Sequence, residues 1–313
     1  MTVDITWKPL EIRPADAGRP GSAAGLAEYL SDRRAIDELL LRNKALVFRD
    51  FGVDPGELEQ VMDLLLPHRL AYVHGTTPRT KVGDNVYTST EYPEAFTITM
   101  HNELSYAATW PARLFFYCHT PAATGGATPV VDGTRWLESI DDEVREAFAQ
   151  GLIYRQNLHG GLGLGKSWQD SFEVDSREAA EEILASTGAT WQWRADGGLR
   201  INQPAPSTLK HPVTGEEVWF NQSDQWHIAG LEEEYAMALA EMMPEEDFPQ
   251  SVTFADGSPI PAEYVRQVRD RGLEAAIDVD WRAGDLMVID NVAVGHGRRP
   301  YSGARRILVG MSD

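Results

Sequence analysis

One triplet and one distant histidine constrain the fold of this chain more than any other feature. The triplet is His101-Asn102-Glu103, and the distant residue is His296, within residues 290–298. In an extended chain, side chains at positions i and i+2 point the same way, so His101 and Glu103 can reach one ion together. His296 must then arrive on another strand, contributed by the far end of the chain.

These three residues form a recognisable donor set for a metal. Two imidazoles and one carboxylate can occupy one face of an ion and leave its other positions open, as in non-haem Fe(II) sites that bind substrate and oxygen. An H-x-E triplet alone arises often by chance, and a lone His or Glu is usually a solvated or hydrogen-bonded structural residue. The triplet therefore predicts an Fe(II) site only in combination with other residues that the same chemistry would require.

The C-terminal segment supplies a cation that could hold a carboxylate. Residues 303–311 have the pattern of a strand, and a guanidinium grips a carboxylate with two parallel hydrogen bonds. Arg305 and Arg306 alternate across that strand, so only one of them can face the interior. Each has apolar neighbours on its own face, and periodicity therefore leaves the choice between them open.

A hydroxyl on a glycine-rich turn is the second group that could hold a carboxylate. Thr128 lies in residues 125–132, where it could help to hold the same carboxylate. A threonine in such a stretch can also simply cap or line the turn. Thr128 is therefore a candidate only in combination with the arginine and the metal residues.

The order of these motifs resembles the taurine dioxygenase superfamily of Fe(II)/2-oxoglutarate-dependent oxygenases. The order is His-Asn-Glu, Gly-Gly-x-Thr, Asp-Asn followed by His-Gly-Arg, and Arg-Arg-Ile-Leu-Val, and it runs from about residue 85 to residue 313. Within the superfamily, the Glu ligand and the His-Gly-Arg sequence are most similar to the clavaminate synthase and amino-acid β-hydroxylase branch. The chain departs from the pattern in a slightly short gap before Arg306 and in Gly310, where some members carry a second arginine.

The resemblance implies a complete set of roles. His101, Glu103 and His296 would bind Fe(II), Thr128 and Arg306 would hold 2-oxoglutarate, and O2 would take the last position on the metal. The implied reaction couples decarboxylation of 2-oxoglutarate to oxidation of a substrate, by default hydroxylation of an unactivated carbon. The branch implies a small-molecule substrate, an amino acid or amino-acid derivative, free or carried on a protein, in natural product biosynthesis.

Short strands with helices between them surround the motifs. The pattern predicts strands at 85–90, 96–100, 113–118, 128–132 and 285–289, and helices at 176–186 and 261–271. This pattern alone indicates an α+β protein, and the resemblance implies a double-stranded β-helix, or jelly roll, with helical decorations and insertions. We expect a single domain over residues 1–313, with a lid-like insertion around 155–210.

A competing motif lies inside that insertion. Residues 160–167 satisfy the G-x4-G-K-[ST] pattern, so a P-loop nucleotide-binding enzyme is the rival hypothesis. A P-loop needs a helix that begins at Lys166 and aims its first amides at phosphate, yet helix signals resume only at Asp175. We therefore expect a glycine-rich lid loop. A third hypothesis, a metal-binding jelly-roll protein without catalysis, leaves the pairing of Thr128 with Arg306 unexplained.

Three polar residues are weaker candidates for a substrate pocket. His159 precedes the glycine-rich loop, Asn221 lies in the aromatic and amide-rich residues 219–226, and Arg298 follows His296 by two positions. Each of them can instead be a packed or ion-paired structural residue.

The net charge of -20 favours solubility and argues against nucleic acid or anionic membrane as a partner, because their phosphates attract Lys and Arg. The residues show neither a cationic-hydrophobic leader nor an apolar run of membrane-spanning length, so we expect a cytoplasmic protein. The oligomeric state stays open.

Overall fold

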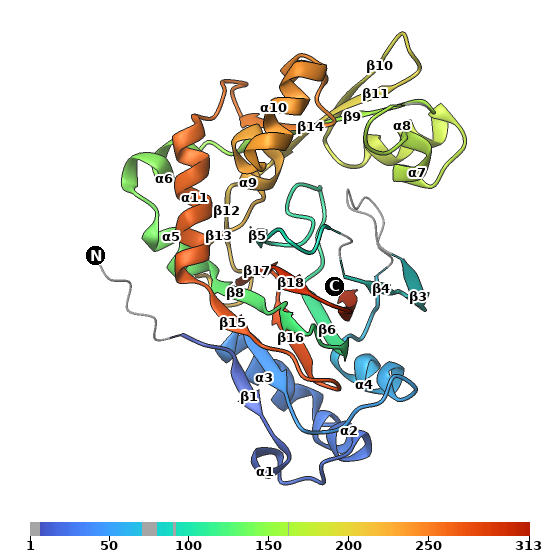
Figure 1. Cartoon of the computed structure of the whole chain (residues 1–313), viewed down its shortest axis with the longest axis vertical. Coiled ribbons are helices and arrows are strands. Elements are labelled where there is room, and N and C mark those ends of the chain that lie inside the picture. The colour runs from blue at the N-terminus through green and yellow to red at the C-terminus, as the bar shows by residue number, and fades with distance from the viewer. Residues whose placement is uncertain (1–6, 71–79, 90–91, 162) are drawn as a thin grey trace.

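Two β-sheets that face each other form the centre of the α+β structure (Figure 1). The computed structural model describes residues 7–70, 80–89, 92–161 and 163–313. The larger sheet contains, in spatial order, β1 (Leu10–Ile12), β2 (Ala45–Phe48), β16 (Leu286–Asp290), β6 (Arg113–Thr120), β19 (Arg306–Ser312), β4 (Val86–Thr88) and β3 (Lys81–Gly83). The smaller sheet contains β15 (Ile277–Val279), β8 (Thr128–Asp132), β17 (Val294–Arg298) and β5 (Ile98–His101).

Strand β6 shows why the larger sheet is apolar on both faces. Leu114, Phe116 and Cys118 pack into the core between the two sheets, while Phe115 and Tyr117 pack into the core on the opposite face. Successive side chains of a strand point to opposite faces, so a strand that is covered on both sides reads as a continuous apolar run.

Four N-terminal helices contribute to the outer core of the larger sheet. They are α1 (Pro14–Ala17), α2 (Ala23–Leu30), α3 (Arg33–Asn43) and α4 (Leu58–Leu65). Two of them begin where a short polar side chain caps the first turn: Ser22 Oγ accepts from Gly25 N, and Asp32 Oδ1 accepts from Ala35 N. Leu26, Leu30 and Leu40 bury the apolar stripes of these helices.

Helices α5 (Gly133–Ser139) and α11 (Ala262–Ala275) contact the smaller sheet. Further helices of this part of the chain are α6 (Asp142–Phe148), α9 (Ser223–Trp226), η1 (Ile228–Gly230), α10 (Glu233–Met242) and η2 (Glu245–Asp247). Trp136 of α5 is buried against α11, and its indole Nε1 donates to the carbonyl of Val268 at 2.9 Å. None of the helices in the described part of the chain is long and apolar enough to cross a membrane.

The expected insertion forms a separate sheet with its own apolar cluster, at the upper right of Figure 1. In chain order it contains β9 (Leu152–Leu158), α7 (Trp168–Phe172), α8 (Arg177–Ala185), β10 (Thr190–Trp193) and β11 (Leu199–Ala205). The later strand β14 (Gln250–Phe254) pairs with β9 and completes this sheet. Two small pairs remain, β12 (Thr208–Lys210) with β13 (Glu217–Trp219), and β7 (Thr124–Gly125) with β18 (Tyr301–Ser302).

Candidate active site

Neighbouring strands of the smaller sheet bring the two histidines together. β5 and β17 pair antiparallel with His101 opposite His296, and the ring centroids are 4.2 Å apart. Glu103 completes the group, with its Oε2 3.8 Å from Nε2 of His296. All three side chains are buried, and one ligand atom from each lies within 4.8 Å of the others. The predicted convergence of these residues is therefore confirmed.

The donor chemistry fits a metal of the Fe(II) type. Two imidazole nitrogens and one carboxylate oxygen converge from one side, and the Nδ1 atom of His101 lies 2.9 Å from the carbonyl oxygen of Thr99. A hydrogen bond at Nδ1 fixes the ring orientation and leaves Nε2 for a metal. The expected extended conformation is only partly right, because β5 ends at His101 and Glu103 stands in the turn that follows.

A small cavity of about 40 Å³ lies beside the histidines. Its walls include His101, His296, Thr128, Arg298 and Arg305. Neither guanidinium forms an ion pair with a carboxylate of any residue that the structure describes. Two largely buried cations without an acidic partner are unfavourable unless an anion joins them. The small cavity therefore suits a negatively charged ligand.

Arg305 is held against the cavity wall by the glycine-rich turn. Its Nε donates to the carbonyl of Gly126 at 3.0 Å, and a Cβ at Gly126 would meet the same side chain at 3.1 Å. Gly126 also has φ +73°, which favours glycine. Burial, followed by the charge of Arg298, lowers the pKa of Arg305 to about 10. The guanidinium thus stays charged at neutral pH and would gain from a carboxylate.

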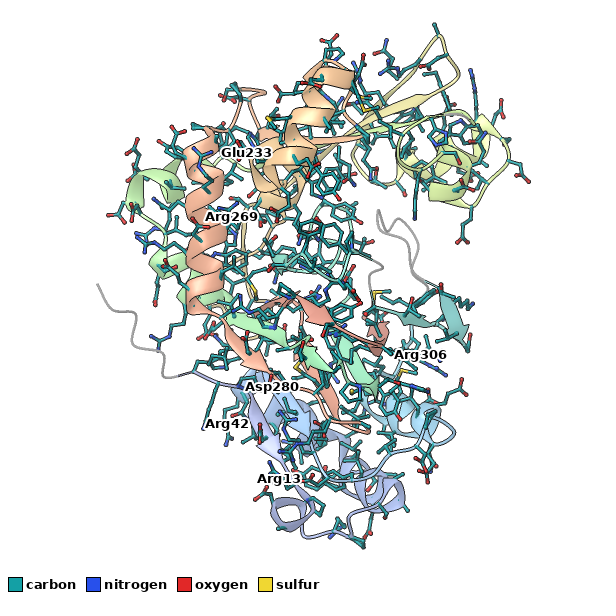
Figure 2. All side chains as sticks on the ribbon, viewed as in Figure 1. Arg13, Arg42, Glu233, Arg269, Asp280 and Arg306 are labelled. Carbon is teal, nitrogen blue, oxygen red and sulfur yellow. The ribbon has the colours of Figure 1, made fainter. Side chains whose placement is uncertain are left out.

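The expectation that Arg306 faces the site is corrected by the structure. Arg306 is exposed and pairs with Thr120 at the start of β19, while Arg305 shares the cavity face with Ile307 and Val309. Figure 2 labels Arg306 at the right-hand side of the molecule. The strand register shifts just after Arg306, and both faces of β19 are apolar, so alternation could not distinguish the two arginines.

Thr128 lines the small cavity with a constrained hydroxyl. The indole Nε1 of Trp281 donates to Thr128 Oγ1 at 2.9 Å. Because an indole N–H is only a donor, the Thr128 oxygen accepts there and its own proton can point toward another acceptor. The residue is 3% exposed, so the proton has few alternatives to a ligand in the cavity.

A large cavity of about 480 Å³ opens on the other side of the triad. It reaches His101 and Glu103 and carries polar side chains from several elements: Thr97, Thr99, Gln222, Gln225, Glu232, Gln250, Arg269 and Asp270. Tyr106 and Trp226 form an aromatic wall, with ring centroids 4.7 Å apart, and also line a third cavity of about 170 Å³ below the insertion. The triad therefore lies between an anion-suited cavity and a larger polar one.

Two of the three weaker candidates are corrected. Asn221 is 1% exposed, and its amide is used locally, donating to the carbonyl of Ser207 and accepting from Ser223 N. His159 is absent from the residues that line either cavity at the triad. Arg298 lines the small cavity and is absent from the lining of the large one.

The glycine-rich loop does not have the geometry of a phosphate cradle. The ring of His159 fills it: Nδ1 accepts from Gly161 N, and Nε2 lies 3.2 Å from the carbonyl oxygen of Gly165. Leu162, within this loop, is outside the described residues. A short helix, α7, does begin after Ser167, where no helix was expected, but β9 before the loop belongs to an antiparallel sheet. The P-loop interpretation has no structural support.

The sequence interpretation missed the amides that support the triad. Gln225 Nε2 donates to the carbonyl of Thr99 and lies 3.0 Å from Nδ1 of His101, and Gln222 Nε2 donates to the carbonyl of Asn102 at 2.7 Å. Residues 219–226 do contribute to the large cavity, through Gln222, Gln225 and Trp226 and not through Asn221. The i, i+3 spacing of Gln222 and Gln225 on one helical turn is the signal that could have identified them.

Comparison with known proteins gives a consistent result over the whole chain. The family model described as taurine catabolism dioxygenase TauD, TfdA family matches residues 14–312. The dapdiamide synthesis protein DdaC of Enterobacter agglomerans is 34% identical over 96% of this chain and 94% of its own length. The clavaminate synthase-like protein At3g21360 of Arabidopsis thaliana is 30% identical over 97% of this chain and 93% of its own.

Solved structures extend the similarity to the fold. The crystal structure of PvcB from Pseudomonas aeruginosa superposes with a TM-score of 0.54 at 16% identity, over 96% of this chain and 84% of PvcB. A further structure of PvcB, described as an Fe, alpha-ketoglutarate dependent oxygenase from an isonitrile synthetic pathway, has a TM-score of 0.52. At this identity the likeness concerns the fold alone.

Proposed function

The chain belongs to the TauD, TfdA family of dioxygenases, whose members use Fe(II), 2-oxoglutarate and O2, and from this premise we propose that it hydroxylates an amino acid or an amino-acid-derived small molecule. The observation that carries the proposal is the position of the triad. His101 lines both cavities, Glu103 lines the large one and His296 the small one, whose two arginines have no carboxylate partner among the described residues. One cavity suits the co-substrate, and the other suits a substrate.

We propose that the triad holds Fe(II) and that the small cavity holds 2-oxoglutarate. When bound, Fe(II) supplies the oxidising chemistry, in which 2-oxoglutarate is decarboxylated and O2 is consumed. Arg305 would hold the far carboxylate by charge-assisted hydrogen bonds, and the Thr128 hydroxyl would donate to it. Arg305 takes the role first assigned to Arg306. Thr128 is buried, and a low-dielectric environment strengthens charge-assisted contacts of this kind.

The large cavity supports a polar, small substrate. Glu232 offers an anion, the glutamines offer both donors and acceptors, and Arg269 on α11 adds a cation that also pairs with Asp270 at 2.9 Å. This combination suits a molecule that carries both an amino and a carboxylate group. DdaC is named for dapdiamide synthesis and PvcB for an isonitrile pathway, and these names support a role in specialised metabolism. The substrate would be free or carried on a protein.

Three further features belong to the same proposal. The facing sheets would be the two halves of a double-stranded β-helix, in agreement with the fold of PvcB. The insertion around 155–210 would act as a lid, because the third cavity separates it from the aromatic wall of the large cavity.

A cytoplasmic location, the site of most small-molecule metabolism, is also proposed.

The triad is tested by metal binding in the absence of oxygen. Wild-type protein should bind one Fe(II) per chain and consume 2-oxoglutarate slowly without substrate, whereas His101→Ala and His296→Ala should lose both properties. His119→Ala is the matched control, because this half-buried histidine on β6 bonds to its neighbour Thr120. Unchanged metal binding in both triad variants would exclude the assignment.

The substrate is tested by a screen that measures succinate. Amino acids, their amides and carrier-bound derivatives would be added one at a time with 2-oxoglutarate, and products would be examined by mass spectrometry. A substrate that gains one oxygen atom as succinate is formed is the expected result. A product without added oxygen would replace hydroxylation by another oxidation.

A further inference from the structure

Arg298 connects the small cavity to the wall of the large one. Its guanidinium donates to three backbone carbonyls of one loop, those of Tyr92 at 2.8 Å, Pro93 at 2.6 Å and Phe96 at 2.9 Å. The side chain also lies over the ring of Tyr92, 5.8 Å from its centroid. A planar fork with five N–H groups can hold several carbonyls at once, which an ammonium on a flexible stem cannot do in the same geometry.

Arg298 also lines the small cavity, together with Arg305 and Thr128. Its Nε–H is buried without a hydrogen-bond partner among the described residues. An unsatisfied buried donor next to an anion-suited cavity can be stabilised by the ligand that enters it. The guanidinium of Arg298 thus places three hydrogen bonds on the loop, while its Nε–H has no partner among the described residues.

The loop that Arg298 holds is a wall of the large cavity. Tyr92, Thr97, Ile98 and Thr99 all line that cavity, and Ile98 lines the small cavity as well. Three hydrogen bonds from a single side chain therefore fix the backbone from which this wall is built. Residues 92–95 are exposed, and among the described residues the loop's other backbone hydrogen bonds run from Tyr301 N to the Glu94 carbonyl at 2.9 Å and from Phe96 N to the Pro93 carbonyl at 3.2 Å.

The restraint extends to the mouth of the large cavity. The ring of Phe96 contacts Tyr235 of helix α10 with centroids 5.9 Å apart, and the segment before α10 contributes Leu231 and Glu232 to the cavity lining. No residue of α10 is buried, and Tyr235 is 50% exposed. This helix consequently depends on few contacts, and one of them reaches back to the loop held by Arg298.

We propose that Arg298 is a positioning residue that fixes the wall of the large cavity, residues 92–99, and that a dicarboxylate bound in the small cavity strengthens this restraint. The inference rests on the proposed function, because it takes the small cavity as the 2-oxoglutarate site and the large one as the substrate site. Arg298 acts through the loop and does not need to touch the substrate.

Hydrogen–deuterium exchange of the wild-type chain tests the inference without turnover. Mn(II) would occupy the metal site, and N-oxalylglycine would stand in for 2-oxoglutarate. The expected result is that the analogue slows exchange in peptides covering 92–99 by about fivefold or more, the lower end of usual coupling between two sites. Equal exchange with and without bound analogue would overturn the inference.

Two variants separate the hydrogen-bonding fork from its charge. Arg298→Lys keeps the charge but cannot span three carbonyls, and Arg298→Gln removes both. In both variants, residues 92–99 should exchange quickly whether or not the analogue is present, and the KM for substrate should rise more than kcat falls. Arg299→Gln is the matched control, because its neighbouring guanidinium bonds to the exposed Asp278 instead. Wild-type protection of 92–99 in Arg298→Lys would contradict the inference.

The exchange experiment distinguishes failure of the proposed function from failure of the inference about Arg298. If Mn(II) and N-oxalylglycine do not bind the wild-type chain, the proposed function is wrong, and this inference falls with it. If they bind and leave the exchange of residues 92–99 unchanged, only the inference is wrong. Melting temperatures of the variants show whether a change in exchange is confined to the loop.

Discussion

The side chain of Asn291 and the backbone of Glu103 form a reciprocal pair. Asn291 Oδ1 accepts the Glu103 N–H at 2.8 Å, and its Nδ2 donates to the Glu103 carbonyl at 3.1 Å. The pair stabilises a turn in which the next residue, Leu104, has φ +57°, which is unfavourable for leucine. Asn291 therefore holds the carboxylate of Glu103 beside the histidines although it touches no ligand atom itself.

We predict that Asn291→Ala weakens metal binding while leaving the three ligands in place. The expected loss is about 10–100-fold in Fe(II) affinity, the usual effect of removing a residue that orients a ligand. Isothermal titration with Fe(II) under anaerobic conditions measures it. Asn221→Ala is the matched control, because it also removes a buried, hydrogen-bonded asparagine but one that has no contact with the triad. Equal losses in both variants would mean a general effect on folding.

The second prediction distinguishes the adjacent arginines. Arg305→Gln should raise the KM for 2-oxoglutarate about 30-fold or more, since losing a buried charged contact costs ~2–5 kcal/mol. Arg306→Gln should change it little, because that side chain is exposed. Initial rates at varied 2-oxoglutarate measure both. The reverse ranking would return the role to Arg306.

The third prediction concerns the indole that orients Thr128. Trp281→Phe removes the donor to Thr128 Oγ1, so the hydroxyl can rotate away from the small cavity. The KM for 2-oxoglutarate should rise about fivefold, as expected for one neutral hydrogen bond of ~1 kcal/mol, with kcat nearly unchanged. A fall in kcat at unchanged KM would show that Trp281 acts on the reaction by another route.

The fourth prediction is a pH dependence of stability. Burial raises the pKa of Asp224 from 3.8 to about 6, and the Thr99 hydroxyl, the next largest influence, opposes that rise. Because the folded pKa is raised, the stability that the neutral carboxyl provides is present below about pH 4 and is lost as the pH rises through 6. Asp224→Asn should therefore be more stable by about 3 kcal/mol at pH 8 and nearly equal near pH 4.

Urea unfolding of the metal-free protein at several pH values measures this difference. Metal must be absent, because a bound cation nearby would alter the charge balance of the site. Asp256→Asn is the control, since hydrogen bonds from Ser258 lower the pKa of this exposed carboxyl and its pH dependence should have the opposite sign. A difference for Asp224→Asn that stays constant from pH 4 to pH 8 would contradict the prediction.

The sequence was sufficient to predict that the three candidate metal residues converge, because their chemistry is rare and their spacing is local. His101 and Glu103 lie two positions apart, and the only missing information was which distant histidine would pair with them. The register of β5 and β17 supplies it by placing His296 opposite His101. The surrounding strands could be predicted for a different reason. Their apolar runs are short and bounded by turns.

The sequence was not sufficient where a side chain's direction depends on packing from both sides. β19 is covered on both faces, so hydrophobic alternation gave Arg305 and Arg306 equal neighbours. Asn221 and Gln222 are also adjacent and polar, but only Gln222 lines the large cavity. His159 looked exposed to a pocket, yet its ring fills its own glycine loop. Each of these outcomes required knowledge of tertiary contacts.

The pairing of β5 with β17 joins residues that are far apart in the chain, and this would affect when during biosynthesis the proposed metal site is completed. A nascent chain leaving the ribosome carries His101 and Glu103 long before His296 has been synthesised, and two ligands hold a divalent ion weakly. Closing the long intervening loop is entropically costly, so the strand that carries His296 docks only against an already formed partner. Under the proposed assignment, the complete set of three ligands would exist only after β17 has docked on β5, and a chain that stalls before β17 would lack one of them.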